Sequence, residues 1–230
     1  MAVLSEHAAL NGICPYFTMF PLEFPLGILR KGAARGDWVL DPFCGRGTTN
    51  FASRLLGLPS LGIDSNPVAA AITASKLVDT AAVDIVREAR EILASSLRVS
   101  VPEGEFWEWA FDRQTLQQVC QFREALVQDC RTPARIALRG VILGALHGPQ
   151  QKTFPSYLSN QSPRTYSPKP AYSVGFWKRH NMRPQRVDVL AVIERRAKRY
   201  YSDLPKGTGL FRLADSRVPE SVRPVEPNSR

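Results

Sequence analysis

Short apolar runs alternate with helical patterns in the first third of the chain. Each run is about three residues long and ends in an aspartate, Asp41 or Asp64. Each is followed by a stretch whose apolar residues lie three and four positions apart, the spacing of an amphipathic helix. The pattern predicts strands over 38–40 and 61–63 and helices over 48–56 and 66–78, a βαβ-type succession.

A longer region with mostly helical spacing separates this succession from a third apolar run. We expect helices over 83–97, 114–127, 134–146 and 186–201, with an aromatic cluster at 106–109. Residues 148–170 hold five prolines and no apolar period, which predicts a loop. The run 210–214 ends at Asp215 and predicts a third strand.

Prolines mark both ends of the chain. Pro15, Pro21 and Pro25 are expected to prevent a helix within the aromatic and apolar segment 16–29. The tail over 218–230 holds three prolines and is expected to be disordered or cut short.

Taken together, these patterns predict an α/β fold in which an open sheet is interrupted by a large helical insertion. We expect a first part of the α/β core over 1–80, a basic helical insertion over 81–205, and the third strand with the tail over 206–230. Every predicted strand ends in an aspartate, and ligands of such sheets bind at the carboxyl ends of the strands.

Composition adds a charge asymmetry to this picture. The 230 residues carry a net charge of +9, and residues 131–200 hold 14 Lys or Arg against two acids. Such a block predicts a phosphate-rich partner, although a solvated basic face without a partner has the same composition.

Other classes of protein are disfavoured by composition. No run is long and apolar enough for a transmembrane helix, and the first ten residues do not have the pattern of a signal peptide. Four cysteines without a C-x-x-C pair and three scattered histidines give no zinc pattern. We therefore expect no metal, no membrane, and reduced thiols in a cytoplasmic protein.

The turn after the first predicted strand has the chemistry of a nucleoside site. Gly45 and Gly47 permit close backbone approach to a ligand, and Thr48 could cap the following helix. Asp64 is placed to accept ribose hydroxyls, and Asp215 to accept an adenine amino group. Asn50 stands where dinucleotide-binding proteins have a third glycine, and the G-K-[ST] of a P-loop is absent.

The run Asp41-Pro42-Phe43-Cys44-Gly45-Arg46-Gly47-Thr48-Thr49 resembles the first motif of DNA methyltransferases that modify exocyclic amino groups, D-P-F-x-G-x-G-T-T. Residues 62–69 resemble the second motif, with its acid and an N-P-x-A helix start, and residues 16–21 resemble the aromatic segment before the first motif. The likeness covers mainly residues 14–78. It implies a partial Rossmann-like methyltransferase sheet.

The resemblance also implies S-adenosylmethionine as the cofactor. The predicted cofactor residues are Tyr16, Phe17, Thr18, Phe20, Asp41, Pro42, Phe43, Gly45, Gly47, Thr48, Thr49, Asp64, Ser65, Asn66 and Asp215. Cys44 is interpreted as a small packing residue at the variable place of the motif rather than as a nucleophile.

The catalytic motif of this family is missing from the sequence. The family holds the flipped base with Asp, Asn or Ser, two prolines and an aromatic residue, and this sequence has no Pro-Pro dipeptide. The nearest similar segment, 167–172, lies before the third strand, at the wrong place. The sequence also lacks the Pro-Cys dipeptide typical of enzymes that make 5-methylcytosine.

Several functions therefore remain open. The favoured one is methylation of N4 of cytosine or N6 of adenine in DNA, as one half of a split enzyme completed by a second polypeptide. A truncated remnant, a non-catalytic DNA-binding or activating subunit with a cofactor pocket, and an RNA guanine-N2 methyltransferase are alternatives.

The basic insertion is the predicted nucleic-acid arm. Its candidate phosphate contacts are Lys178, Arg179, Arg195, Arg196 and Arg199. Amides at 159–161 could read base edges. The pair Phe176 and Trp177 could stack on bases, but we favour a core position for both.

Overall fold

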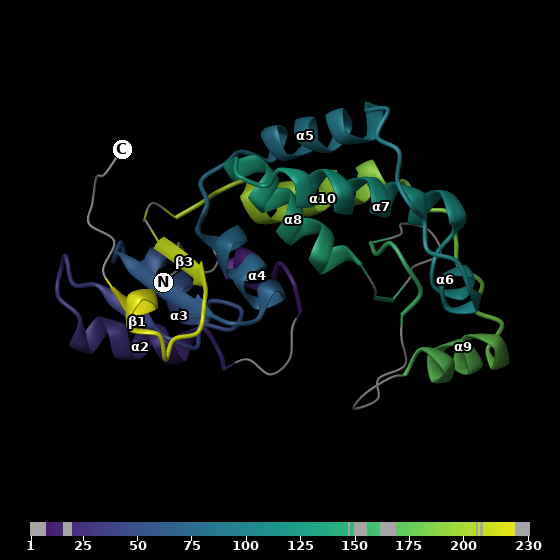
Figure 1. Cartoon of the computed structure of the whole chain (residues 1–230). Helices are drawn as coiled ribbons and strands as arrows, with labels where there is room; N and C mark the ends of the chain where they lie inside the picture. The colour runs from purple at the N-terminus through teal and green to yellow at the C-terminus, as the bar shows by residue number, and fades with distance from the viewer. Residues whose placement is uncertain are drawn as a thin grey trace. The chain divides into compact units, whose positions relative to one another are not determined.

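The computed structural model describes residues 8–15, 20–146, 148–149, 156–161, 169–205, 207 and 209–223. The chain forms two compact units, one made of residues 1–81 and 199–230 and the other of residues 82–198. Figure 1 shows the strands with helices α2, α3 and α4 in the first unit and the helices α5 to α9 in the second.

The first unit contains a parallel sheet of three strands. These are β1 (Val39–Asp41), β2 (Ser60–Asp64) and β3 (Gly209–Leu213), in the spatial order β1-β2-β3. Asp41 lies opposite Gly62, and Asp64 lies opposite Leu213, so the carboxyl ends of all three strands meet at one edge. All three predicted strands are confirmed to within one residue at each end.

Helices α3 (Thr48–Leu55) and α4 (Pro67–Leu77) follow β1 and β2 as predicted. The side chain of Asn66 accepts hydrogen bonds from the amides of Val68 and Ala69, and Pro67 occupies the first helical position of α4. A short 3-10 helix, η1 (Ala8–Gly12), precedes them along the chain. The small parallel sheet with its helices is consistent with part of a Rossmann-like fold.

The expectation that prolines prevent a helix in the segment 16–29 is wrong from residue 23 onward. Helix α2 spans Glu23–Gly32 and contains Pro25 as its third residue. The first four amides of a helix have no intrahelical partner, so a proline in this turn removes no hydrogen bond. Pro25 and Leu26 are buried instead.

Arg54 ties together the two ends of the long region that separates α4 from β3. Its Nη1 donates to the carbonyls of Lys76 (2.7 Å) and Val78 (3.0 Å), where the chain leaves α4. Its Nε donates to the carbonyl of Pro205 (3.1 Å), where the chain returns toward β3. One buried side chain therefore holds the chain both where it leaves α4 and where it returns toward β3.

The second unit is helical. Its helices are α5 (Ala82–Ala94), α6 (Glu105–Ala110), α7 (Arg113–Gln128), α8 (Pro133–Ala145), α9 (Pro170–Arg179) and most of α10 (Val189–Tyr201). Helix α5 packs against α7 and α8, and an ion pair of 2.8 Å joins Glu88 to Arg135. The predicted helix over 83–97 ends three residues early, and α6 and α9 are additional to the prediction.

Aromatic residues hold α6 against α9. Trp109 and Trp177 are buried in one cluster with Val174, and Phe106 packs on it. The indole of Trp177 donates to the carbonyl of Gln161 (2.8 Å). Trp177 thus has the core position that the sequence favoured.

The proline-rich tail contains more structure than expected. Residues Pro219–Val222 form a 3-10 helix, η2, and Arg212 donates to the carbonyl of Ser221 (2.7 Å). The remainder of the tail, 224–230, lies outside the described residues. No helix in the described part of the chain is long and apolar enough to cross a membrane.

Candidate cofactor site

Residues 42–47 form the turn between β1 and α3, which we call the glycine turn. Hydrogen bonds within its own backbone and to the neighbouring strand hold it. The Asp41 carboxylate accepts from the amide of Phe43 (3.1 Å), and the amide of Cys44 donates to the carbonyl of Ile63 in β2 (2.9 Å). The amide of Gly47 donates to the carbonyl of Cys44 (2.7 Å). These bonds fix the turn at the carboxyl edge of the sheet.

The two glycines of the turn have different surroundings. Gly45 and Gly47 both have positive φ, +50° and +71°, a region that favours glycine. A Cβ on Gly47 would lie 2.7 Å from the side chain of Thr73 in α4, whereas a Cβ on Gly45 would meet no atom within 4 Å. Gly47 therefore permits close packing of α4, while the space beside Gly45 is open to a ligand.

Asp64 is oriented by two backbone amides. Its Oδ2 accepts from the amide of Gly45 (2.9 Å), and its Oδ1 accepts from the amide of Asn66 (2.8 Å). Each carboxylate oxygen keeps a further lone pair for a ligand hydroxyl. The structure thus joins the acid at the end of β2 to the glycine turn after β1.

Asn50 and Gly62 explain how the site departs from the dinucleotide pattern. Asn50 is fully buried, and its Nδ2 donates to the Ser60 hydroxyl (3.2 Å). A Cβ on Gly62 would lie 2.6 Å from Asn50 Oδ1. The glycine that permits close packing of helix on strand therefore stands on β2 rather than on α3.

The prediction that Thr48 caps α3 is wrong. The cap residue is Gly47 in the left-handed conformation, with no side-chain hydrogen bond, and Thr48 is the buried first residue of the helix. The following Thr49 is half-buried. The turn needs a positive φ immediately before the helix, and this places the cap one residue earlier.

The remaining predicted residues near the turn differ in exposure. Phe43 is 79% exposed and Ser65 is exposed, while Pro42 is half-buried. Phe20 is exposed and makes an edge-to-face contact with Phe24, with ring centroids 5.5 Å apart. Tyr16, Phe17 and Thr18 lie outside the described residues.

Asp215 lies at the same edge of the sheet as Asp64, because the amide of Ala214 donates to the carbonyl of Asp64 (3.1 Å). Its carboxylate accepts from Nε (3.0 Å) and Nη2 (2.5 Å) of Arg217. These hydrogen bonds lower the pKa of Asp215 to about 2, so the group is a carboxylate at neutral pH. A ligand amino group would share this carboxylate with Arg217.

Cys44 has the properties of a packing residue. It is buried, with its sulfur 3.7 Å from the Thr73 hydroxyl. Burial raises the pKa of the thiol to about 12, so the thiolate that a nucleophile needs is not populated near neutral pH.

Three buried residues around the turn were missed from the sequence: Asn11, Arg46 and Lys76. Arg46 Nη2 donates to the Asn11 carbonyl (2.8 Å), and Lys76 Nζ donates to Asn11 Oδ1 (2.8 Å). One signal was available, since Lys76 is the only charged residue in the otherwise apolar and small helix 67–77.

The five basic side chains predicted to contact phosphates differ in their exposure and in their contacts with other side chains. Lys178 forms an ion pair with Glu105, and Arg179 is exposed at the end of α9. Arg196 lies over the ring of Tyr157, 4.9 Å from its centroid. Along α10, Arg195 and Arg199 are exposed, and the guanidinium of Arg199 also lies 5.6 Å from the ring centroid of its neighbour Tyr200.

The interpretation of residues 159–161 as base readers is wrong for two of them. Ser159 and Asn160 are buried. Asn160 Nδ2 donates to the carbonyls of Trp109 (2.8 Å) and Met182 (2.7 Å), so this amide joins separate segments of the second unit. The segment 167–172 does not resemble a catalytic turn in its described part, because Pro170 is the first residue of α9.

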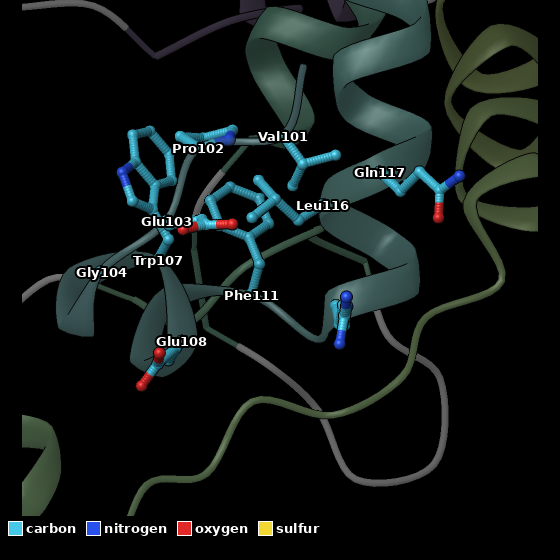
Figure 2. Close-up of a pocket in the computed structure, with 10 residues that line it drawn as sticks. Val101, Pro102, Glu103, Gly104, Trp107, Glu108, Phe111, Leu116 and Gln117 are labelled. Atoms are coloured by element: carbon cyan, nitrogen blue, oxygen red, sulfur yellow. The ribbon is translucent and has the colours of Figure 1, made fainter. Parts of the chain in front are cut away.

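A separate hollow of about 680 Å³ lies in the second unit (Figure 2). Trp107 and Phe111 line it, with their rings stacked at 6.2 Å, together with Glu103 and Glu108. None of the motif residues lines it. Across the described residues, no group of three or more His, Cys, Asp or Glu side chains could hold a metal ion.

Comparison with known proteins agrees with the motifs. Residues 5–75 match a family model described as DNA methylase. A stretch of 65 residues, 28% of the chain, is 47% identical to the Type II methyltransferase M.BsoBI of Geobacillus stearothermophilus. The resemblance to DNA amino-methyltransferases is thereby confirmed for this part of the chain. The aligned stretch covers 13% of that relative's length, and no solved structure is significantly similar to the chain.

Proposed function

We propose that this chain provides the S-adenosylmethionine-binding part of an enzyme that methylates an exocyclic amino group in DNA, N4 of cytosine or N6 of adenine. The observation that carries the proposal is the hydrogen bond between the Gly45 amide and the Asp64 carboxylate. It joins the two motifs at the carboxyl edge of the sheet, within the segment that matches the DNA methylase model.

The residues present fit this cofactor. The open space beside Gly45 would admit the nucleoside, and Asp64 would accept hydrogen bonds from its ribose hydroxyls. Asp215, a carboxylate at neutral pH, would accept from the adenine amino group. Phe43, with its large exposed ring, would cover an aromatic face of the ligand.

The cofactor supplies a methyl group on a sulfonium. Held beside Gly45 and Asp64, the cofactor would supply this methyl group to the amino nitrogen of the base, which would release one proton to solvent while the electron pair of the carbon–sulfur bond stays on sulfur. The chain's contribution is orientation, because the turn and Asp64 hold the methyl donor in place. No covalent intermediate on Cys44 is needed, in agreement with its burial.

A second polypeptide is proposed to supply the residues that hold the base. Strand β1 pairs only with β2 among the described strands, and Trp38 and Leu40 are each about half exposed. Parallel sheets are normally covered on both faces, and doubly wound sheets continue beyond their first strand. The open side of β1 therefore suits a further parallel strand. A second copy of this chain across a two-fold axis would present β1 antiparallel.

The test is transfer of a labelled methyl group to duplex DNA. The chain would be assayed alone and together with a polypeptide that carries the missing tetrapeptide and is encoded beside it. We expect cofactor binding by the chain alone and transfer only with both polypeptides. Tight cofactor binding without transfer in either assay would leave a non-catalytic subunit and overturn the enzyme proposal.

DNA contact is proposed for α10 and the end of α9. Arg195 and Arg199 lie four residues apart, so both project from one side of α10. Lys178 is a weaker candidate because DNA would have to compete with Glu105. Arg196 is held by the Tyr157 ring and by the carbonyl of Ser156 (3.3 Å).

A further inference from the structure

Two cations are buried next to the glycine turn without an acidic partner. Arg46 is 9% exposed and Lys76 is 0% exposed, and neither forms an ion pair with a described acid. Both donate to the same residue, Asn11: Arg46 to its backbone oxygen and Lys76 to its side-chain oxygen, each at 2.8 Å. We call this arrangement the Asn11 bridge.

The Asn11 bridge is costly for the fold. The Nε of Arg46 is buried and has no hydrogen-bond partner. Burial, followed by the nearby Arg46, holds the pKa of Lys76 well below its usual range. Apolar side chains of similar size would avoid both costs, so packing alone does not account for these residues.

The bridge connects two parts of the candidate cofactor site. Arg46 stands between Gly45 and Gly47, so fixing its side chain on Asn11 restricts the backbone on both sides of it. Asn11 belongs to η1 and precedes Tyr16 by five residues, and the aromatic segment predicted to pack on the cofactor's methionine part begins at Tyr16. Thr73 holds the same turn from α4 by donating to the Gly45 carbonyl (2.9 Å).

We propose that Asn11, Arg46 and Lys76 are positioning residues for cofactor binding: the bridge holds the glycine turn in its ligand-ready conformation and fixes the N-terminal segment to it. This inference rests on the proposed function, since it assigns residues to the same site. The three residues act through the backbone of the turn and do not touch the ligand.

Calorimetric titration of the purified chain with S-adenosylhomocysteine tests this proposal. We expect Arg46→Lys, which removes the guanidinium that donates to the Asn11 carbonyl, to raise the Kd about tenfold, equal to ~1.4 kcal/mol of binding free energy. Asn11→Ala removes only the acceptor of Lys76 and should raise the Kd by a smaller factor. The matched control is Arg54→Lys, because Arg54 is also a buried arginine but donates to the carbonyls of Lys76, Val78 and Pro205 rather than to Asn11. All variants are compared at a temperature where each is folded.

Two further measurements separate positioning from general destabilisation. Amide hydrogen exchange should accelerate at residues 44–47 in Arg46→Lys and at residues 10–14 in both Arg46→Lys and Asn11→Ala, and at neither place in Arg54→Lys. Asn11→Asp should restore affinity, since a carboxylate still accepts from Lys76 and also neutralises a buried cation. Should Arg46→Lys fail to fold, the two Asn11 variants carry the test.

The outcomes are distinct. Wild-type affinity in Asn11→Ala and Arg46→Lys, with binding lost in Asp64→Ala, would overturn the positioning role and leave the proposed function standing. An equal loss of affinity in Arg54→Lys would also overturn it, by showing that any buried arginine has this effect. Absence of binding by the wild-type chain would overturn both proposals.

Discussion

The glycine turn after β1 differs from the basic residues of α9 and α10 in how its polar groups are held. We call these basic residues, Lys178, Arg179, Arg195, Arg196 and Arg199, the basic surface. In the turn, the Asp64 carboxylate is fixed by two backbone amides, and Gly45 and Gly47 have the conformations that the turn requires. On the basic surface, cations lie on exposed helix positions, and some are paired with acids or aromatic rings. A small-molecule site needs fixed geometry, whereas phosphate contact needs mainly charge and reach.

Loss of the Asp64 carboxylate should have the largest effect. Asp64→Ala removes a proposed ligand acceptor and also leaves the Gly45 amide without its partner. We expect the Kd for S-adenosylhomocysteine to rise about 100-fold or more, because hydrogen bonds to charged groups are the strong ones. Glu23→Gln, at an exposed acid of α2, is the control and should bind as the wild type does. Binding retained in Asp64→Ala would refute the site.

The close packing of α3 on β2 gives the next largest effect. In Gly62→Ala the new Cβ would lie 2.6 Å from Asn50 Oδ1, in a buried place where the asparagine has little room to move. We expect the free energy of unfolding to fall by about 1–3 kcal/mol, measured by urea denaturation. Gly12→Ala, where a Cβ meets no atom within 4 Å, should change it little. Equal free energies of unfolding for Gly62→Ala and Gly12→Ala would show that Asn50 can move away from the new Cβ at no cost.

Lys76 should make stability depend on pH. Its pKa is lowered in the folded chain by burial and by Arg46, while Cys14 and Cys44 act in the opposite direction. The unfolded chain therefore binds more protons below the ordinary lysine pKa of 10.5. Stability should fall as the pH is lowered from there toward the folded pKa, by up to about 1.4 kcal/mol per pH unit.

Lys76→Met should remove this part of the pH dependence. The measurement is urea unfolding of both proteins at a series of pH values between 7 and 10. Cys44, whose pKa is raised from 9.0 to about 12, lowers the stability of both proteins as the pH rises above 9, so its contribution cancels when the two proteins are compared. If the free energies of unfolding of the two proteins changed with pH in parallel, the lowered pKa of Lys76 would be contradicted.

The basic surface should respond least to single changes. Arg195→Ala and Arg199→Ala should each weaken DNA binding by about 1 kcal/mol or less, almost equally for all sequences, and lower the salt slope by about 1. Lys178→Ala should do less because Lys178 is paired with Glu105. Fluorescence anisotropy at several salt concentrations measures both quantities. A sequence-dependent loss would instead indicate base contacts.

Some elements could not be predicted because local rules allow more than one structure. A proline near the start of a segment either prevents a helix or opens one, and both α2 and α9 contain one in their first turn. Asn160 was interpreted as a base reader because amides serve both functions. Only its hydrogen bonds to the carbonyls of Trp109 and Met182 show that it joins parts of the fold.

The sequence by itself determined the strands, the helices α3 and α4, and the residues of the glycine turn. These depend on local periodicity and on residue types that few other conformations tolerate. The tertiary structure decided which of these residues meet. It placed Gly62 against Asn50, the Asp64 carboxylate on the Gly45 amide, and Arg46 and Lys76 on Asn11. Such contacts join residues 12 to 65 positions apart, a distance over which no local pattern in a single sequence carries information.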